Sequence, residues 1–366
     1  MKLRRIVLKV GSSSVTDECG HLDVLRLHNI VTMVHEAMAN YDAQIVLVSS
    51  GAVATGRSQL GWTKAHDTMP EKQAAAAVGQ GLLLDAYQKL FSQVQVNIGQ
   101  LLLTRSDIEH RHRFTHMRNT IETLLRYGVV PIVNENDTVA VEEIRFGDND
   151  TLASLVALAT EADLLLILSD IDGLYTANPR KDRSATKLMD VWNIDEAIDR
   201  MAGGAGSSVG TGGMRTKIKA AKIATDSGVD VIIAHHQEPH VLVQILQGKA
   251  VGTRFHALPD PLSSRRSWVA HGSRVQGTLI LDHGAIHALM HQSASLLLPG
   301  IQRVCGTFSE GATVELSEQN GRIIGKGMTN FASADLISLL QRRRAGEKLQ
   351  SLQEIVHRNQ MALEKE

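Results

Sequence analysis

The feature that most constrains the fold of this chain is a regular alternation of short apolar runs with longer helix-like stretches. The runs are rich in Val, Ile and Leu on both faces, as in a parallel sheet that helices cover on each side. They span residues 6–10, 44–49, 94–103, 129–133, 164–169 and 231–234. The helix-like stretches span residues 22–39, 72–91, 106–126, 151–160 and 214–227. This alternation predicts an α/β sandwich over about the first 255 residues.

The character of the sequence changes after residue 257. Two prolines, followed by serines and arginines, predict a linker over residues 258–275. Short strand candidates with Gly or Asn turns follow at residues 277–282, 304–308, 313–317 and 323–329, and they predict a compact β-rich module over 276–352. The charged chain from Arg342 onward is expected to be helical and solvated, with residues 353–366 as a charged tail.

Length and charge exclude several classes of protein. A chain of 366 residues is long enough for about two domains. Its 38 Lys and Arg balance 39 Asp and Glu, so no global basic field attracts nucleic acid or an anionic membrane. The chain has only two cysteines, Cys19 and Cys305, and they lie far apart in the sequence, which excludes a disulfide framework. Both are interpreted as packing or surface residues. No apolar run approaches the ~20 residues of a membrane helix, and no signal peptide is visible. We therefore expect a soluble, cytoplasmic protein.

Two glycine-containing segments are candidate phosphate sites. Lys9 ends the first predicted strand and is followed by Gly11 and three serines, whose amides and hydroxyls suit phosphate oxygens. A surface turn with a solvated lysine is the alternative. The second segment, residues 210–217, opens a helix and places Lys217 one turn inside it. A surface loop explains this segment equally well, and no Walker A motif occurs in the chain.

Polar clusters follow further predicted strands, at residues 49–52, 134–137 and 147–150. Ligands of open α/β sheets bind at the carboxyl ends of the strands, where these clusters are expected to meet. Asp148 alone is most simply a helix cap. Asp150 suits either a lysine or a metal ion as its partner, and both alternatives stay open. The Asn and Asp residues of these clusters offer donors and acceptors to a zwitterionic substrate.

Two lysines with glycine-rich loops indicate phosphoryl transfer, a reaction that mostly needs positive charge and alignment around the phosphoryl group. A carboxylate acceptor is already nucleophilic, so this chemistry requires no Cys or His nucleophile.

The order and spacing of five motifs resemble those of the glutamate 5-kinase family of amino-acid kinases. The motifs are KVGS (9–12), SSGA (49–52), NEND (134–137), GDND (147–150) and GGMRTK (212–217). The resemblance implies an amino-acid kinase-like three-layer sandwich with a mainly parallel sheet over residues 1–257. It also implies a PUA-like domain over 276–352, although residues 310–327 depart from the PUA pattern.

The resemblance implies an activity and its ligands. The reaction is ATP-dependent phosphorylation of the γ-carboxylate of L-glutamate to γ-glutamyl 5-phosphate, the first step of proline biosynthesis. Mg²⁺ is expected to arrive with ATP, with no metal held by the protein itself. Proline is an expected feedback inhibitor, and a homo-oligomer, either a dimer or a tetramer, is expected.

The resemblance also implies residue roles, by position. Lys9 and Lys217 would neutralise the transferring phosphoryl group, and Asp150 would orient both lysines. The residues implied to hold glutamate are Ser50, Gly51, Ala52, Asn134, Asp137 and Asn149. The residues implied to bind ATP are Lys9, Gly11, Ser12, Ser169, Asp170, Thr211, Gly212, Gly213, Met214, Arg215, Thr216 and Lys217.

Two alternative functions are compatible with these residues. One is another amino-acid kinase that phosphorylates a different acceptor. The other is an RNA-binding or regulatory protein that uses its C-terminal module. RNA binding is not expected, because the arginines of that module are scattered rather than clustered. His110, His112 and His116 are interpreted as a solvated or interface helix face rather than metal ligands.

Overall fold

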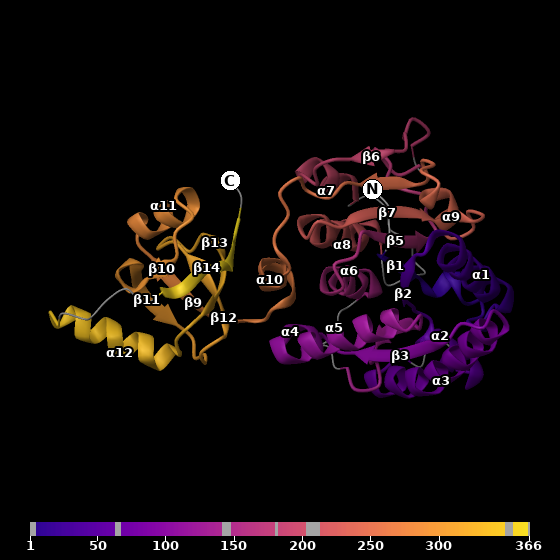
Figure 1. The fold of residues 1–366 in the computed structure, drawn as a ribbon, viewed down its shortest axis with the longest axis horizontal. Helices are drawn as coiled ribbons and strands as arrows, with labels where there is room; N and C mark the ends of the chain where they lie inside the picture. The colour runs from indigo at the N-terminus through magenta and orange to yellow at the C-terminus, as the bar shows by residue number, and fades with distance from the viewer. Residues whose placement is uncertain are drawn as a thin grey trace. The chain divides into compact units, whose positions relative to one another are not determined.

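The computed structural model describes residues 5–62, 67–140, 148–179, 182–202, 213–347 and 354–364 (Figure 1). The chain divides into two compact units, Met1–Pro261 and Leu262–Glu366. The predicted α/β fold and the β-rich second module are both present. No helix among the described residues is long and apolar enough to cross a membrane.

The first unit is built on an eight-stranded sheet of order β3-β4-β2-β1-β5-β7-β8-β6. Six strands are parallel: β1 (Arg5–Val10), β2 (Gln44–Val48), β3 (Ile98–Leu103), β4 (Val130–Glu135), β5 (Leu164–Ser169) and β7 (Asp230–His235). They correspond to the six predicted apolar runs. Two short strands extend the edge: β8 (Thr253–Phe255) runs antiparallel to β7, and β6 (Asp190–Val191) pairs parallel with β8. Neither short strand was predicted, because two or three residues carry no readable periodicity.

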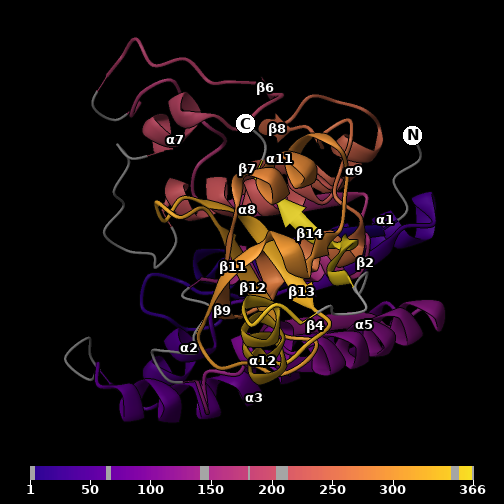
Figure 2. The same cartoon turned by 90° about the vertical axis from the view of Figure 1, so that its left-hand side faces the viewer.

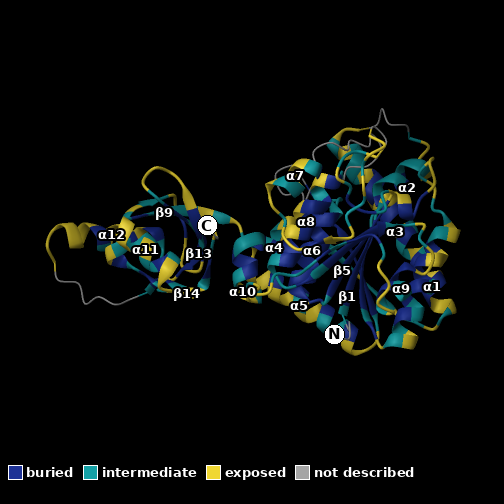
Figure 3. Cartoon of the chain, turned by 90° about the horizontal axis from the view of Figure 1, so that it is seen from above, coloured by how far each residue is buried: buried dark blue, intermediate teal, exposed yellow. Residues whose placement is uncertain are grey.

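Helices cover both faces of this sheet. Helices α1 (Val24–Tyr41), α3 (Met69–Gln93) and α9 (Val241–Leu246) bury their apolar residues against one face. The helices α5 (Arg111–Arg126), α6 (Asn149–Ala159) and α8 (Met214–Asp226) lie on the other face. Figure 3 shows the buried strands β1 and β5 between α6 and α8 on one side and α1 and α9 on the other. The remaining helices of this unit are α2 (Ala52–Gln59), α4 (Arg105–Glu109) and α7 (Glu196–Ala202).

Two predicted boundaries in this unit are wrong. The run 94–103 becomes a strand only at Ile98, because a turn at residues 94–95, with Gln95 in the left-handed conformation (φ 58°), follows the end of α3 at Gln93. The single helix predicted over 106–126 is two helices, α4 and α5. The break occurs at His110, which is extended (φ −95°, ψ 115°) and lies between them.

The alternation of side chains along β1 directs Lys9 away from the main core. Ile6, Leu8 and Val10 are fully buried in the core that α1 and α3 cover. Because successive side chains of a strand point to opposite faces, Lys9 points toward α6 and α8 instead. A charged residue at the end of a central strand is thus placed on the face where α6 and α8 begin.

The second unit contains a six-stranded sheet of order β10-β14-β13-β12-β9-β11. Its strands are β9 (Val275–Leu281), β10 (Leu296–Leu297), β11 (Ile301–Cys305), β12 (Thr313–Ser317), β13 (Ile323–Thr329) and β14 (Glu354–Leu363). Figure 2 shows β9, β11, β12, β13 and β14 between α11 (His283–His291) and α12 (Ser333–Arg344). The apolar core of the unit includes Leu279, Val314, Leu336 and Val356.

The end of the chain corrects the prediction of a solvated helical tail. Residues of β14 pair with β13 and β10, and Ile355, Val356 and Met361 are buried. The prediction failed because the buried apolar residues of this strand form only two short pairs, 355–356 and 361–362, separated by polar and charged residues.

Part of the predicted linker is also ordered structure. Within residues 258–275, helix α10 (Ser264–Ser267) and the π-helical turn Trp268–Gly272 contact β13 and β14. Trp268 and Val269 are buried, and Lys326 Nζ donates a hydrogen bond to the Ala270 carbonyl at 3.0 Å.

Candidate active site

Two lysines from distant parts of the sequence share one buried carboxylate. Lys9 Nζ, at the end of β1, lies 2.7 Å from Asp150 Oδ1. Lys217 Nζ, in the first turn of α8, lies 3.1 Å from Asp150 Oδ2. All three residues are buried: Lys9 is 7% exposed, Lys217 is 5% exposed and Asp150 is 1% exposed. Two ammonium groups therefore face a single buried carboxylate.

The two lysines keep Asp150 ionised. Burial alone would raise the pKa of this carboxyl, but the charges of Lys9 and Lys217 and their hydrogen bonds lower it below the ordinary value of 3.8. Burial raises the pKa of the neighbouring Asp148, and the negative charge of Asp150 adds to that increase. Of the two adjacent acids, Asp150 therefore carries the stable negative charge.

Local caps hold these groups in place. Asp148 is the N-cap of α6 and accepts a hydrogen bond from the Thr151 amide at 2.7 Å, so the cap interpretation of Asp148 is confirmed. On the opposite helix, Thr216 Oγ1 donates to Asp150 Oδ2 at 3.0 Å and lies 2.8 Å from the Gly213 carbonyl at the N-cap of α8. The starts of α6 and α8 are thus joined through Asp150.

A second polar group lies beside Asp150. Asn149 Nδ2 is 3.0 Å from the Ser49 carbonyl, 2.8 Å from Ser50 Oγ and 3.0 Å from Asn134 Oδ1. The ends of β2 and β4 and the start of α6 therefore meet at one amide. Asn149 Oδ1 is buried and has no hydrogen-bond partner among the described residues. A buried acceptor without a partner is costly, so this oxygen is available to a donor from a ligand.

Helix α3 supports this polar group with residues that the sequence analysis missed. Asn134 Nδ2 donates to Gln80 Oε1 at 2.9 Å, and the Tyr87 hydroxyl lies 3.0 Å from Ser49 Oγ. Tyr87 is fully buried, and burial raises the pKa of its hydroxyl. Gln73 Nε2 donates to the Ala140 carbonyl at 3.0 Å. These three polar residues recur every seven positions, so they share one face of α3, and that spacing is the signal that could have revealed them.

Glycines allow close approach at two further points. Gly51, the N-cap of α2, has φ 105°, and a Cβ there would lie 2.7 Å from Val15 Cγ2. A Cβ at Gly11 would lie 3.7 Å from Lys9 Nζ, so the absent side chain leaves space beside the lysine. Ser12 is exposed at the start of the 3₁₀ turn Ser12–Ser14.

Other predicted site residues lie at neighbouring strand and helix ends. Ser169 ends β5, next to β1, and its Oγ lies 3.1 Å from Oδ1 of the exposed Asp170. Met214 is buried at the start of α8, and Arg215 is exposed. Asp137 is half-buried and engaged in a contact of its own. Thr211 and Gly212 lie outside the described residues.

The site combines two chemical capabilities at one edge of the sheet. The lysine pair offers fixed positive charge to an anion whose charge grows during a reaction. The amide and hydroxyl groups of Asn149, Asn134 and Ser50 offer hydrogen bonds to a small polar molecule beside it. This arrangement suits transfer of a phosphoryl group to a bound polar acceptor.

Comparison with known families gives two matches. The model of the amino acid kinase family matches residues 4–235, and the model of the PUA domain matches residues 277–346.

Curated relatives match nearly the whole chain. A glutamate 5-kinase from Carboxydothermus hydrogenoformans is 46% identical over 366 residues, covering 99% of this chain and 98% of that protein. A glutamate 5-kinase from Bordetella pertussis is 47% identical over 337 residues, covering 92% of this chain and 89% of that protein.

Solved structures resemble the fold. A carbamate kinase from Giardia lamblia bound to AMP-PNP superposes with a TM-score of 0.52 at 19% identity, covering 69% of this chain and 98% of that chain. A UMP kinase from Bacillus anthracis gives a TM-score of 0.50 at 15% identity, covering 70% of this chain and 97% of that chain. At these identities the likeness concerns the fold alone.

Proposed function

Because this chain belongs to the glutamate 5-kinases of the amino acid kinase family, we propose that its site transfers the γ-phosphoryl group of ATP to the γ-carboxylate of L-glutamate. The product is γ-glutamyl 5-phosphate, made at the first step of proline biosynthesis. The observation that carries the proposal is the pair of ammonium groups, Lys9 and Lys217, held on the single buried carboxylate of Asp150.

In this proposal the lysines act on the phosphoryl group during transfer. The transition state of phosphoryl transfer spreads negative charge over the equatorial oxygens, and preorganised cations stabilise it without rearrangement. Asp150 positions both ammonium groups, since each of its oxygens contacts one lysine. The space beside Gly11, next to Lys9 Nζ, gives the phosphate room to approach. Ser12, Ser169, Asp170 and the residues from Thr211 to Thr216 are proposed to line the rest of the nucleotide site.

The acceptor is proposed to bind at the amide group beside the lysines. Asn149 Oδ1 is buried and has no partner in the part of the chain that the structure describes, so it suits an N–H donor such as the ammonium group of an amino acid. Ser50 and Asn134 contact the same amide, and Gly51 and Ala52 form the adjacent start of α2. Asp137 is proposed as the counter-charge of the substrate ammonium group. The γ-carboxylate supplies its own nucleophilic oxygen, so no general base is required.

Mg²⁺ is proposed to arrive on the phosphates of ATP. Both oxygens of Asp150 are engaged by lysines, and Asp148 caps α6, so these carboxylates do not fit a metal ion held by the protein.

Regulation and assembly are further proposals. We propose that proline, an amino acid like the substrate, inhibits by binding at or near the glutamate pocket. We also propose a homo-oligomeric cytoplasmic enzyme, either a dimer or a tetramer.

The boundaries of the kinase domain at 1–257 and the PUA-like domain at 276–352 are likewise proposed. RNA binding is not part of this proposal, since the arginines of the second unit are scattered in the sequence and two of those in α12 bond to backbone carbonyls of the same unit. Arg343 Nη1 donates to the Pro299 carbonyl at 2.9 Å, and Arg344 Nη2 donates to the Gln302 carbonyl at 2.9 Å.

The test is an ADP-release assay with ATP, Mg²⁺ and a panel of acceptors. We expect turnover that depends on L-glutamate, with aspartate, acetylglutamate and carbamate as poor acceptors, and inhibition when proline is added. Better turnover with one of those other acceptors would contradict the proposal and indicate a different amino acid kinase.

A further inference from the structure

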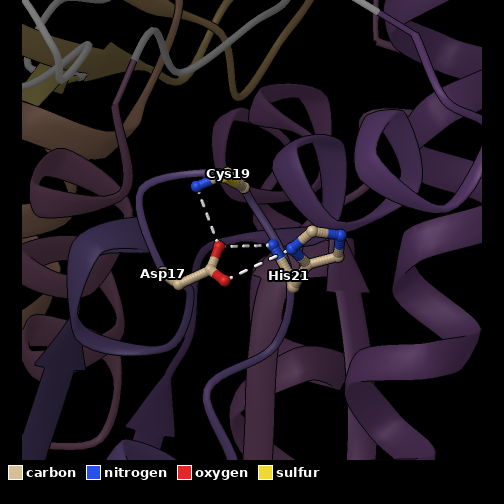
Figure 4. A group of neighbouring side chains, drawn as sticks. All are labelled: Asp17, Cys19 and His21. Atoms are coloured by element: carbon tan, nitrogen blue, oxygen red, sulfur yellow. Dashed lines mark hydrogen bonds and ion pairs between the residues drawn. The ribbon is translucent and has the colours of Figure 1, made fainter.

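A group of potential metal ligands lies outside the candidate active site. Within the described part of the chain, one set of three His, Cys, Asp or Glu side chains converges: Asp17, Cys19 and His21. A carboxylate oxygen, a thiol sulfur and an imidazole nitrogen all lie within 4.8 Å of one another. Figure 4 shows the three side chains on one short loop. All three residues are exposed, so solvent and ions reach them freely.

Backbone contacts join the two ends of this loop and fix its turn. Thr16 and Leu22 form an isolated antiparallel bridge at its base. The Asp17 amide donates to the His21 carbonyl at 2.9 Å, and Gly20 takes the left-handed conformation (φ 85°) that the tight turn requires. A Cβ at Gly20 would lie 2.9 Å from the Ala54 carbonyl, so the loop lies closely against α2. The ligand atoms are therefore carried by a constrained backbone.

The spacing of two ligand atoms matches a tetrahedral zinc site. Zn²⁺ binds imidazole nitrogen and carboxylate oxygen at about 2.0–2.2 Å, which at a tetrahedral angle separates the two atoms by about 3.3 Å. His21 Nδ1 and Asp17 Oδ2 lie 3.2 Å apart. An ion can enter between these atoms with little movement of either residue.

We propose that Asp17, Cys19 and His21 form a binding site for a thiophilic divalent cation such as Zn²⁺, with water as the fourth ligand. On binding, the Cys19 thiol releases its proton to solvent, and the sulfur coordinates as the thiolate. A mixed set of sulfur, nitrogen and oxygen ligands selects against Mg²⁺, which prefers oxygen alone. The site is therefore distinct from the Mg²⁺ that accompanies ATP.

The position of the site connects it to two segments of the kinase unit. The Thr16 amide, at the base of the loop, donates to the Ser12 carbonyl at 2.9 Å, within the turn that follows Gly11. Gly20 lies against α2, which begins at Gly51 and Ala52. None of the three ligands belongs to the proposed catalytic or substrate-binding residues, so their substitution should leave basal kinase activity unchanged.

The test is a titration of the metal-free, full-length protein with Co²⁺, followed by competition with Zn²⁺. We expect a thiolate-to-cobalt charge-transfer band, the intense visible bands of tetrahedral Co²⁺, and loss of both when Zn²⁺ is added. In C19S the charge-transfer band should disappear and the Kd for Zn²⁺ should rise at least about 100-fold, beyond the effect of losing an outer-sphere partner. His21→Asn should also raise the Kd for Zn²⁺.

The matched control is C305S, which removes the other free cysteine of the chain, a half-buried residue of the second unit. It should keep the cobalt spectrum and the Zn²⁺ affinity of the parent protein. An unchanged spectrum in C19S, loss of the spectrum in C305S, or a parent protein without a charge-transfer band would each overturn the proposal. Zn²⁺ should also raise the Tm of the parent protein but not of C19S.

Discussion

A carboxylate that is 1% exposed and shared by two ammonium groups loses its hydration when the chain folds. Such a group is tolerated because its partners replace the water, and removal of one partner typically costs about 3–5 kcal/mol. The ionised state of Asp150 therefore depends on its contacts with both Lys9 and Lys217. Substitutions at this cluster should reveal separate contributions to stability and to catalysis.

Asp150→Asn should destabilise the fold in a pH-dependent way. The pKa of Asp150 is lowered in the folded protein, so its stabilising contribution is fully present above the ordinary value of 3.8. That contribution is lost as the pH falls through the lower, folded-state pKa. Urea unfolding of both proteins at several pH values from 7 downward should show a difference in free energy that shrinks at acid pH. A difference that grows as the pH falls would contradict this account.

Lys217→Met should lower kcat much more than it changes the KM for glutamate. The ammonium group is proposed to act mainly on the transition state, and loss of one such preorganised group costs about 10²–10³-fold in kcat. Methionine preserves most of the buried stem of the side chain.

The control for this experiment is Lys219→Met, which removes an exposed lysine two residues along the same helix. This control variant should leave both kcat and the KM for glutamate unchanged. A large rise of the glutamate KM with little effect on kcat in Lys217→Met would place Lys217 in ground-state binding instead.

At the scale of the element, helix α3 connects packing to the acceptor site. Its backbone meets that of α2 so closely that a Cβ at Gly79 would lie 1.8 Å from the Ala52 carbonyl, and one at Gly56 would lie 1.7 Å from the Ala75 carbonyl. The same helix carries Gln80 and Tyr87 to the ends of β4 and β2. The start of α2 and the amide group at Asn149 are therefore both positioned by α3.

Gly79→Ala should destabilise the protein by about 1–3 kcal/mol or more, because the added methyl group overlaps backbone atoms that cannot move independently. The shift of α2 should also raise the glutamate KM. Gly81→Ala is the matched control, since nothing lies within 4 Å of its Cβ position, and it should raise Tm through helix propensity. Equal Tm values for the two variants would contradict the close contact of α2 and α3.

Gln80→Met should raise the glutamate KM by about tenfold, the equivalent of about 1.4 kcal/mol, and leave the ATP KM nearly unchanged. The substitution keeps the side-chain volume but removes the acceptor of Asn134 Nδ2, so the amide of Asn134 is no longer oriented. Steady-state kinetics with each substrate varied in turn measure the KM for glutamate and the KM for ATP separately. Gln88→Met, at an exposed position of the same helix where the side chain bonds to Ser92, should behave like the parent.

At the scale of the whole molecule, every proposed catalytic and substrate-binding residue lies in the unit Met1–Pro261. A chain ended after Pro261 should therefore fold and retain glutamate-dependent kinase activity. Circular dichroism and the ADP-release assay check the two parts of this expectation. A truncated protein that is folded but inactive would show that the second unit is required for catalysis.

Much of the first unit was predictable because its parallel strands are buried on both faces and read as uninterrupted apolar runs. The site residues could be expected at the strand ends for the same reason, since parallel strands present their carboxyl ends at one edge. Strands β6 and β8 lacked such a signal, and β14 concealed its buried pairs among charged residues. Gln80 and Tyr87 looked like ordinary helix positions, because the groups that they contact come from other strands.

The sequence by itself determined the α/β class, the six central strands and the polar residues that follow them, since these depend on local periodicity and on the residues that end each strand. Only the tertiary structure decided which partners meet: both lysines on Asp150, three acceptors around Asn149 Nδ2, and β14 inside the second sheet. Those contacts join residues far apart in the chain, and their energies come from burial and geometry that no local pattern encodes.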